Sequence, residues 1–356
     1  MSEGPGLIVL FGSGETSASG RKVFDWLLRR LPSPARVAIL ETPAGFELNS
    51  AQVAGRIGGF LRQRLQNHRP QITIVPARKR GTAFSPDDPD ISALIPGSDA
   101  VFLGPGSPTY AVRQLQDSLA WHTVVASQRQ GAAVVLASAA TVAVGRHVLP
   151  VYEIYKAGED PHWREGLDFF GAYGLSLVFV SHWNNKDGGV ELDTSRCYMG
   201  QARFGPMLDM LPSDVTVVGI DEHTALVFDL ATATCRVLGR DGITLLRAGK
   251  ERLFRRGASF PMGELGPFCS PELRAGLPAE VWERVQAARV LARADVPTVQ
   301  TGEVLVLVEQ RERARAARDW SAADTLRERI ADMGWQVLDT PDGPRLEPVR
   351  AGSQSC

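Results

Sequence analysis

The sequence contains no cysteine pair, no long apolar run and no excess of charge of one sign. Its four cysteines stand apart among 356 residues, without a Cys-x-x-Cys spacing, which argues against a disulfide framework or a zinc site and fits a reducing compartment. No apolar run reaches the roughly 18 residues that a membrane helix needs. The first residues show no charged segment followed by an apolar one, as a signal peptide would. We therefore expect a cytoplasmic protein.

The charge balance excludes a strong basic field. Lys and Arg total 39 and Asp and Glu total 40, so the net charge is -1, and a whole-protein surface for gripping nucleic acid is not expected. The loop Gly12-Ser-Gly-Glu-Thr lacks the third glycine of a dinucleotide fingerprint, because Ser17 stands there. No histidine pair has metal-ligand spacing. The sequence implies neither a metal nor a cofactor.

Short apolar runs alternate with amphipathic stretches in the first part of the chain. Strands are predicted at Leu7–Phe11, Arg36–Leu40, Ile72–Val75, Ala100–Leu103 and Ala132–Ala137, and helices at Ser19–Leu31 and Ala51–Leu65. This alternation predicts an α/β fold with a mostly parallel sheet and helices on both faces. Ligand sites of such sheets lie beyond the carboxyl ends of the strands, which here are the loops after Leu10, Leu40, Leu103 and Ala137.

Further strands follow, and the last of them are expected to finish the sheet as antiparallel hairpins. They are Leu177–Val180, Val215–Ile220, Ala225–Asp229, Cys235–Leu238 and Ile243–Leu246. The expected domain organisation is an α/β domain over residues 1–260, a proline-rich linker and helix over 261–300, a helical hairpin over 301–347 and a disordered tail over 348–356.

The helical hairpin is predicted from a helix over Glu303–Arg318 and a second helix that ends at Met333. Ser321 and Asp324 form a capping-box-like start for the second helix, and Gly334 follows where a left-handed C-terminal residue is expected. A hairpin of about 30 residues is too small to hold a core alone. We therefore expect it to dock on another surface or to form a homodimer.

A serine follows the predicted strand Ala132–Ala137. Ser138 and the small residues after it fit a tight strand-to-helix turn, where a nucleophile is exposed and the next amide points at a developing oxyanion. Serine at a strand end is also a common helix N-cap, and Leu136 occupies a position where such turns usually have a small residue. Spacing alone favours the N-cap.

A serine nucleophile also needs a base and an orienting acid. Of the six histidines, His182 closes the strand Leu177–Ser181 and is placed to project into the crevice at the carboxyl ends of the strands. Glu222 follows a strand in Gly219-Ile-Asp-Glu-His-Thr-Ala-Leu. Taken singly, each also fits a structural role, as a histidine bonded to the backbone and as a turn acid.

Five segments in order resemble the cyanophycinase and dipeptidase E family of serine peptidases, which has the class I glutamine amidotransferase-like α/β fold. They are Leu10-Phe-Gly-Ser-Gly, Phe102-Leu-Gly-Pro-Gly-Ser, Leu136-Ala-Ser-Ala-Ala, Ser181-His-Trp and the segment from Gly219 to Leu226, within about Leu7–Arg247. The resemblance implies that Ser138 is the nucleophile, His182 the base and Glu222 the acid. It implies that the amides of Gly106 and Ala139 form the oxyanion hole.

The same resemblance suggests where substrate binds. Arg203 is similar to the arginine of the helix that follows the family's catalytic histidine, and Ser107 and Asn184 are further candidates for substrate contact. The family's Gly-Gly-Asp-Gln loop becomes Gly104-Pro-Gly-Ser-Pro108, without the side-chain amide, so aspartyl specificity is not carried over. The expected function is serine-dependent hydrolysis of peptide or other amide bonds. The alternative is a catalytically inactive protein on the same fold that binds a small ligand or associates with tRNA.

Two departures bear on the predicted triad. The family's turn Gly-x-Ser-Ala-Gly is Leu136-x-Ser138-Ala-Ala140 here. The stretch Asn184–Cys197 looks like an insertion, and an alternative alignment places Asp193-Thr-Ser195 on the histidine motif, which leaves the triad without its base. We prefer His182, because a strand precedes it and its distance from Ser138 in the sequence fits better.

The tail has a resemblance of its own. From Leu307-Val-Glu-Gln-Arg through Ala323-Asp-Thr-Leu-Arg, with Gly334 and Leu338-Asp-Thr-Pro-Asp-Gly, it resembles the helical C-terminal part of cysteinyl-tRNA synthetases over about Val304–Arg345. The His-Ile-Gly-His and Lys-Met-Ser-Lys-Ser signatures are absent, which excludes aminoacylation. Between Glu309 and Arg329, six arginines interleave with five acids, which favours a solvated helix face. A weak tRNA contact through this hairpin is the alternative.

Overall fold

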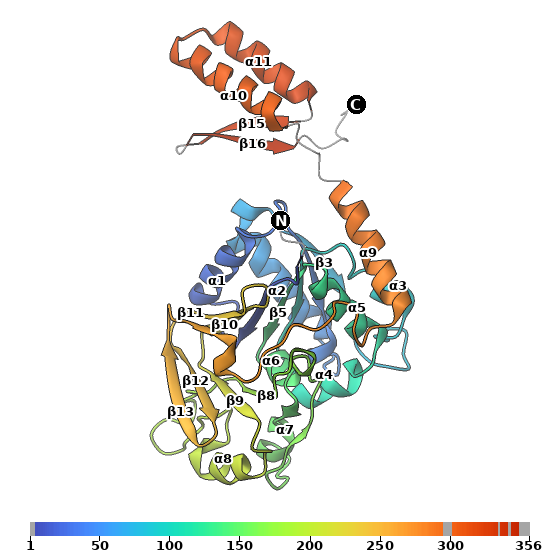
Figure 1. The fold of residues 1–356 in the computed structure, drawn as a ribbon, viewed down its shortest axis with the longest axis vertical. Coiled ribbons are helices and arrows are strands. Elements are labelled where there is room, and N and C mark those ends of the chain that lie inside the picture. The colour runs from blue at the N-terminus through green and yellow to red at the C-terminus, as the bar shows by residue number, and fades with distance from the viewer. Residues whose placement is uncertain (1–3, 295–300, 334, 341–342, 349–356) are drawn as a thin grey trace. The chain divides into compact units, whose positions relative to one another are not determined.

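The computed structural model describes residues 4–294, 301–333, 335–340 and 343–348. The chain divides into two compact units, residues 1–289 and 290–356 (Figure 1). Within the described ranges, no helix is both long enough and apolar enough to cross a membrane.

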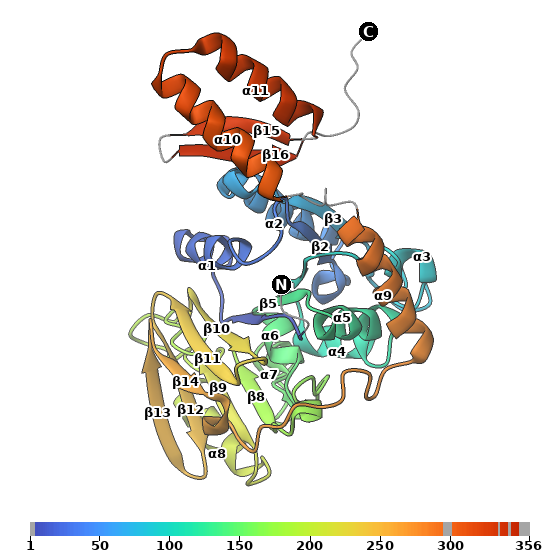
Figure 2. The same ribbon diagram turned by 45° about the horizontal axis from the view of Figure 1, so that its top comes forward.

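An eight-stranded sheet lies at the centre of the first unit (Figures 1 and 2). Its strands are β1 (Ile8–Phe11), β2 (Arg36–Leu40), β3 (Gln71–Val75), β4 (Ala100–Leu103), β5 (Ala133–Ala137), β10 (Thr224–Asp229), β11 (Thr234–Gly239) and β14 (Ser259–Pro261). They are ordered β14-β11-β10-β1-β5-β4-β2-β3. Strands β1, β5, β4, β2 and β3 run parallel to one another. On the other side of β1, strands β10, β11 and β14 each pair antiparallel with their neighbours. The predicted α/β fold with a mostly parallel sheet is confirmed.

The alternation of side chains along β1 explains why helices cover both faces of this sheet. Val9 and Phe11 pack with α1 (Ala18–Leu28) and α2 (Ser50–Arg64). Ile8 and Leu10 point to the other face, since successive strand residues alternate in direction. The helices there are α4 (Pro108–Leu115), α5 (Leu119–Arg129) and α6 (Ala139–Ala143).

A second sheet of four strands packs beside the first, and here the structure differs from the expected single sheet. Its order is β13-β12-β9-β8, and its strands are β8 (Leu177–Val180), β9 (Thr216–Ile220), β12 (Gly242–Arg247) and β13 (Lys250–Arg255). Phe179 and Ile220 face the core that also contains Ile8 and Leu10, whereas Val178 packs on α8 (Gly200–Asp209). An apolar run identifies a strand but not the sheet that it joins, so the sequence left this division open.

Short elements complete the first unit. They are η1 (Thr42–Ala44), η2 (Gln66–His68), α3 (Pro89–Ser92), β6 (His147–Val148), α7 (Val151–Tyr155), β7 (Arg164–Glu165), η3 (Gly171–Tyr173) and η4 (Met262–Glu264). The strands β6 and β7 pair with each other. The helix α9 (Ala279–Ala294) packs on α5, where Val281 and Trp282 contact Ala126.

The second unit contains the predicted helical hairpin and, beyond it, an antiparallel β-hairpin that was not predicted. Its elements are α10 (Thr301–Ala316), α11 (Trp320–Asp332), β15 (Trp335–Thr340) and β16 (Gly343–Pro348). Asp319, rather than Ser321, caps α11, because its Oδ1 accepts the Ala322 amide at 3.0 Å. Trp335 and Val337 pack on Ile330 in a small core. Gly334 and the tail 349–356 lie outside the described residues.

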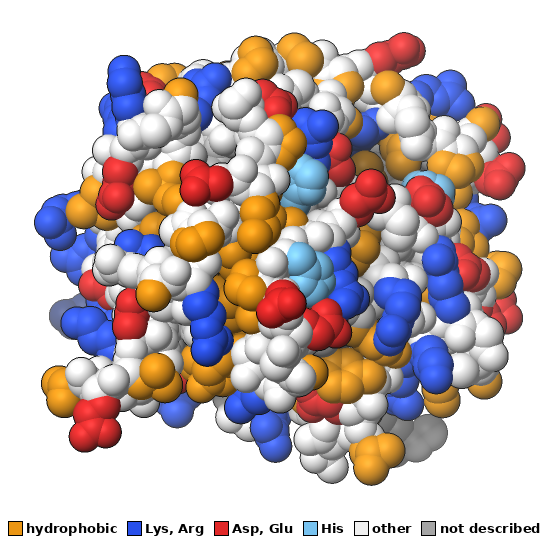
Figure 3. All heavy atoms as spheres, turned by 90° about the horizontal axis from the view of Figure 1, so that it is seen from below, with side chains coloured by type: hydrophobic (Ala, Val, Ile, Leu, Met, Phe, Trp, Pro, Cys, Tyr) orange, Lys and Arg blue, Asp and Glu red, His pale blue; other side chains and the backbone are white. Residues whose placement is uncertain are grey.

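Charges of both signs share the surface. On the face that Figure 3 shows, Lys and Arg side chains alternate with Asp and Glu side chains, and neither sign fills it. This agrees with the net charge of -1. That face therefore has no continuous basic track of the kind that binds a phosphate backbone.

Candidate active site

The predicted nucleophile, base and acid come from three strand ends that meet. Ser138 follows β5, His182 follows β8 after one residue, and Glu222 lies on the link from β9 to β10. The end of β1 binds two of these turns: Phe11 O accepts the Ser138 amide at 3.1 Å, and Gly12 O accepts the His182 amide at 3.4 Å. The meeting point lies at the carboxyl ends of parallel strands, where ligand sites are expected.

Ser138 sits on a strained turn between β5 and α6. Its backbone has φ 52° and ψ -107°, a region that residues other than glycine rarely adopt. The hydroxyl of Thr141 fastens the turn by donating to Phe11 O at 2.9 Å and Leu136 O at 3.0 Å. A serine held in this way between strand and helix has the geometry of a nucleophile elbow.

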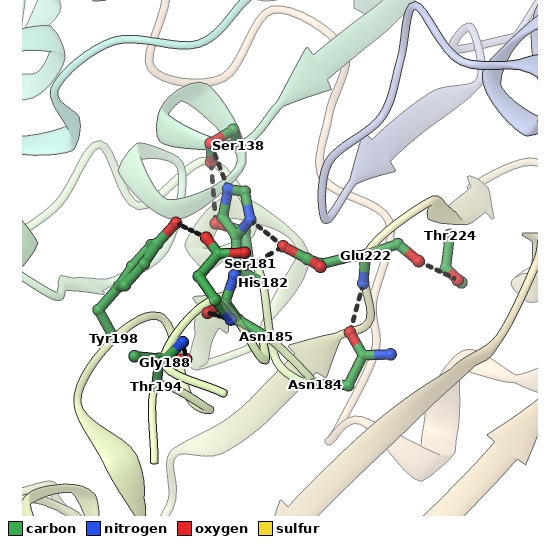
Figure 4. Close-up of polar contacts among 11 residues, drawn as sticks. Ser138, Ser181, His182, Asn184, Asn185, Gly188, Thr194, Tyr198, Glu222 and Thr224 are labelled. Atoms are coloured by element: carbon green, nitrogen blue, oxygen red, sulfur yellow. Dashed lines mark hydrogen bonds and ion pairs between the residues drawn. The ribbon is translucent and has the colours of Figure 1, made fainter. Parts of the chain in front are cut away.

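A continuous hydrogen-bonded chain joins the three side chains (Figure 4). His182 Nδ1 lies 2.8 Å from Glu222 Oε1, and its Nε2 lies 2.9 Å from Ser138 Oγ. The hydrogen bond from His182 lowers the pKa of Glu222, and a second one from Asn185 adds to this, against partial burial that raises it. An ionised carboxylate only accepts hydrogen bonds, so Nδ1 carries the proton and Nε2 is free to accept one from the Ser138 hydroxyl.

Gly106 and Ala139, the predicted oxyanion-hole residues, line the same cavity as Ser138. Ala139 is the first residue of α6, so its N–H has no partner within the helix. Gly106 has φ 151°, and a Cβ there would lie 1.9 Å from Pro43 O, so only glycine fits this loop without displacement. Both residues line the same cavity as Ser138, as an oxyanion hole would require.

The serine and histidine open into a cavity of about 300 Å³. It is lined by Gly106, Pro108, Ser138, Ala139, Val142, Val151, Tyr152, Tyr155, Lys156, Ser181, His182, Cys197 and Tyr198. A larger cavity of about 730 Å³ shares Tyr152 with it and is lined by Phe46, Glu47, Ser107, Thr109, Tyr110, Val112, Arg113, Tyr152, Glu153, Arg164 and Glu165. Together they provide the volume and mixed apolar and polar lining of a small-molecule or peptide site.

The three predicted substrate contacts lie in different places. Ser107 caps α4 by accepting the Tyr110 amide at 3.2 Å, and it lines the larger cavity. Arg203 is exposed on α8 and is not among the residues that line either cavity. Asn184 lies behind the acid, where its Oδ1 accepts the Glu222 amide at 2.8 Å. The geometry therefore gives Asn184 a place in holding Glu222, not in lining the site.

The alternative alignment places the base at Asp193–Ser195, and the structure puts this segment elsewhere. Asp193 Oδ1 accepts the Ser195 amide at 3.0 Å, and its Oδ2 accepts the Gln201 amide at 2.8 Å at the start of α8. The Ser138 hydroxyl instead lies 2.9 Å from His182 Nε2.

The glycine of the Gly219-Ile-Asp-Glu motif makes room for a tryptophan. A Cβ on Gly219 would lie 2.2 Å from the indole of Trp183, which is buried directly after His182. The Arg196 guanidinium covers this indole at 3.7 Å and donates to Trp183 O at 3.2 Å. This packing fixes the chain directly after His182.

Tyr198 and Glu15 interact with His182 and were not predicted from the sequence as site residues. Tyr198 reaches it because Arg196, Cys197 and Tyr198 all adopt positive φ, and its ring centroid lies 6.2 Å from that of His182. No sequence signal marks a left-handed run that contains no glycine. Glu15 is buried, which raises its pKa, although His182 and His223 oppose this. The sequence contains one sign of its nearness to the site, because Glu15 lies in the loop after the first strand.

Comparison with known proteins supports a two-part chain. No family model matches it. A solved peptidase from an acI-B1 actinobacterium aligns with a TM-score of 0.57 and 21% identity over 73% of this chain and 98% of that one. The fold is that of this peptidase. This likeness confirms the α/β architecture that the resemblance implied. It does not test the roles of the site residues.

A different family matches a segment of the chain. A cysteine–tRNA ligase from a Nocardioides species is 37% identical over 117 residues, which are 32% of this chain and 23% of the ligase. The ligase of Methanosarcina mazei is 48% identical over 46 residues, 13% of this chain and 10% of the ligase. The chain thus spans less than a quarter of the length of these relatives. The predicted similarity of one segment to these enzymes is confirmed.

The close approach of Gly106 to Pro43 predicts a large effect of adding one methyl group. We expect Gly106→Ala to lower the free energy of unfolding by about 1–3 kcal/mol, because the Cβ meets backbone and φ is unfavourable. Gly55→Ala in α2 is the matched control, since nothing lies within 4 Å of its Cβ, and it should raise stability by about 1 kcal/mol. Urea unfolding measures both. Equal stability of Gly106→Ala and the parent would contradict the tight loop.

Proposed function

We propose that the protein is a serine-dependent hydrolase of peptide or other amide bonds. The observation that carries the proposal is the hydrogen-bonded chain Ser138–His182–Glu222, which begins at a strained turn and opens into a cavity. The fold shared with a solved peptidase supports it. The buried and unpaired Cys197 and Cys235 support a reducing compartment, and we propose the cytoplasm.

Each group has a defined part in the proposed reaction. Ser138 Oγ attacks the carbonyl carbon while His182 Nε2 takes its proton, and His182 later returns a proton to the leaving amine. Glu222 stays ionised, fixes the tautomer of His182 and stabilises the imidazolium. The amides of Gly106 and Ala139 bind the oxyanion, a contribution of about 3 kcal/mol per donor in serine enzymes. Water then repeats the sequence on the acyl-enzyme.

The direct test is the reactivity of Ser138. A fluorophosphonate probe should label the parent on Ser138, and Ser138→Ala should abolish labelling and lower peptide cleavage by at least about 10³-fold. Cleavage is followed by mass spectrometry with a mixed peptide library. Ser213→Ala is the matched control, because Ser213 is exposed after α8 and lines neither cavity, and it should retain labelling. Labelling of Ser138→Ala at the parent rate would exclude the mechanism.

The pH dependence follows from the same chain of groups. The base must be neutral, so kcat/KM should rise with pH through the pKa of His182, with a slope of one. The hydrogen bond from His182 lowers the pKa of Glu222, so Glu222 is ionised at neutral pH and adds no second limb there. Glu222→Gln should lower kcat by about 10³–10⁴-fold and move the limb to lower pH, because the imidazolium loses its carboxylate. A limb that does not move would argue against Glu222 as the acid.

A second candidate function concerns the segment similar to cysteine–tRNA ligases. That similarity favours a tRNA contact through α10 and α11. The charges oppose it, because Arg311 pairs with Asp339 at 3.0 Å and Arg313 with Glu309 at 2.6 Å. We therefore propose at most a weak contact.

Filter binding of total tRNA to the full chain tests the contact. The proposal predicts retention at about 50 mM salt that is lost at about 200 mM, because counterion release makes phosphate contacts salt-dependent. A chain with residues 301–356 deleted should show no retention. Retention that survives this deletion would place the contact elsewhere.

A further inference from the structure

A hydrogen bond joins Glu222 to Asn185, in the loop after His182, and it takes no part in the proposed proton transfers. Asn185 lies in this loop and is 2% exposed. Its Nδ2 donates to Glu222 Oε1 at 3.0 Å, the same oxygen that accepts from His182 Nδ1 at 2.8 Å (Figure 4). One carboxylate oxygen thus accepts from both side chains.

The orientation of the Asn185 amide is fixed by its other end. Asn185 Oδ1 accepts the Asp187 amide at 3.1 Å. A flipped amide would put a carbonyl oxygen against the Glu222 carboxylate and an NH₂ group against an N–H, so both contacts would be lost. The backbone of Asn185 is also held, because its N–H donates to His182 O at 3.1 Å.

The surrounding loop is closed by further polar contacts. The Tyr198 hydroxyl donates to Asp187 Oδ2 at 2.6 Å, and the Gly188 amide donates to Thr194 Oγ1 at 3.0 Å. The neighbouring Asn184 holds the backbone amide of Glu222. Two consecutive asparagines therefore fix the acid by its main chain and by its carboxylate.

We propose that Asn185 is a positioning residue that aims Glu222 Oε1 at His182 and keeps the shared proton on the imidazole. A carboxylate oxygen with two donors is a weaker base than one with a single donor, so the proton stays on Nδ1 when Nε2 accepts the serine proton. Asn185 touches neither the serine nor the cavity and acts through Glu222. This inference deepens the proposed function and rests on it.

The test is the pKa of His182, measured by NMR titration of the imidazole protons with His182→Gln for assignment. Asn185→Asp replaces the NH₂ donor by a negative oxygen of the same size beside Glu222. We expect the pKa of His182 to rise by about one unit or more, because a second carboxylate favours the imidazolium. The acid limb of fluorophosphonate labelling should then move to higher pH by the same amount.

Asn67→Asp is the matched control. Asn67 is exposed in η2, so this substitution makes the same change of charge away from the site. It should leave the pKa of His182 unchanged. Asn185→Ala removes the donor without adding charge and serves if Asn185→Asp does not fold. It should slow labelling about tenfold and raise the pKa of His182 by a few tenths of a unit.

The outcomes separate this inference from the proposed function. An unchanged pKa of His182 in both Asn185 variants would overturn the positioning role, even if labelling slows through lost stability. A parent that is not labelled would refute the serine mechanism. The NMR titration needs no turnover, so it would still decide whether Asn185 controls the His182–Glu222 pair.

Discussion

The whole site depends on one short segment, residues 221–223, where the chain passes from the second sheet to the first. β9 belongs to the second sheet and β10 to the first, and Glu222 lies on the link between them. β8 and β9 are parallel neighbours with Val180 opposite Gly219, so the chain leaves both strands at the same edge. His182 and Glu222 follow at that edge within hydrogen-bond distance, while β10 pairs with β1 and so brings this segment to the end of β5.

Two cavities lie beside this geometry. Tyr152 lines both cavities, so the larger cavity lies next to the one that contains Ser138. There the rings of Phe46 and Tyr110 lie 5.1 Å apart, and Glu153 accepts the Thr109 hydroxyl at 2.6 Å. Aromatic rings and a few fixed polar groups therefore line the larger cavity.

Much of the fold and the central chemistry could be predicted from the sequence. Buried strands such as Arg36–Leu40 and Ala100–Leu103 are predicted to the residue, because short apolar runs bounded by turn residues have few alternatives. The resemblance named Ser138, His182 and Glu222, which the structure brings together. The assignment of catalytic roles to them stays a prediction.

The remaining features depend on long-range or conformational terms that a linear pattern does not carry. The two-sheet division depends on which strands pair, and β15–β16 on a hairpin in a segment that was assigned to helices alone. Tyr198 enters the site through positive φ at residues without the usual glycine. Asn184 was predicted to contact substrate; its observed contact with the Glu222 amide depends on the fold of the link between β9 and β10, which the sequence pattern does not give.

The altered elbow is compatible with a working serine. Leu136 and Ala140 replace small residues of the related turn, but both are buried, 1% and 2% exposed, so their bulk fills the core instead of crowding Ser138. The positive φ of Ser138 costs of order 1–3 kcal/mol. The hydroxyl of Thr141 offsets part of this by sharing its one proton between Phe11 O and Leu136 O, since a hydrogen bond contributes about 1 kcal/mol. The strained turn is thus held by hydrogen bonds to the two neighbouring strands.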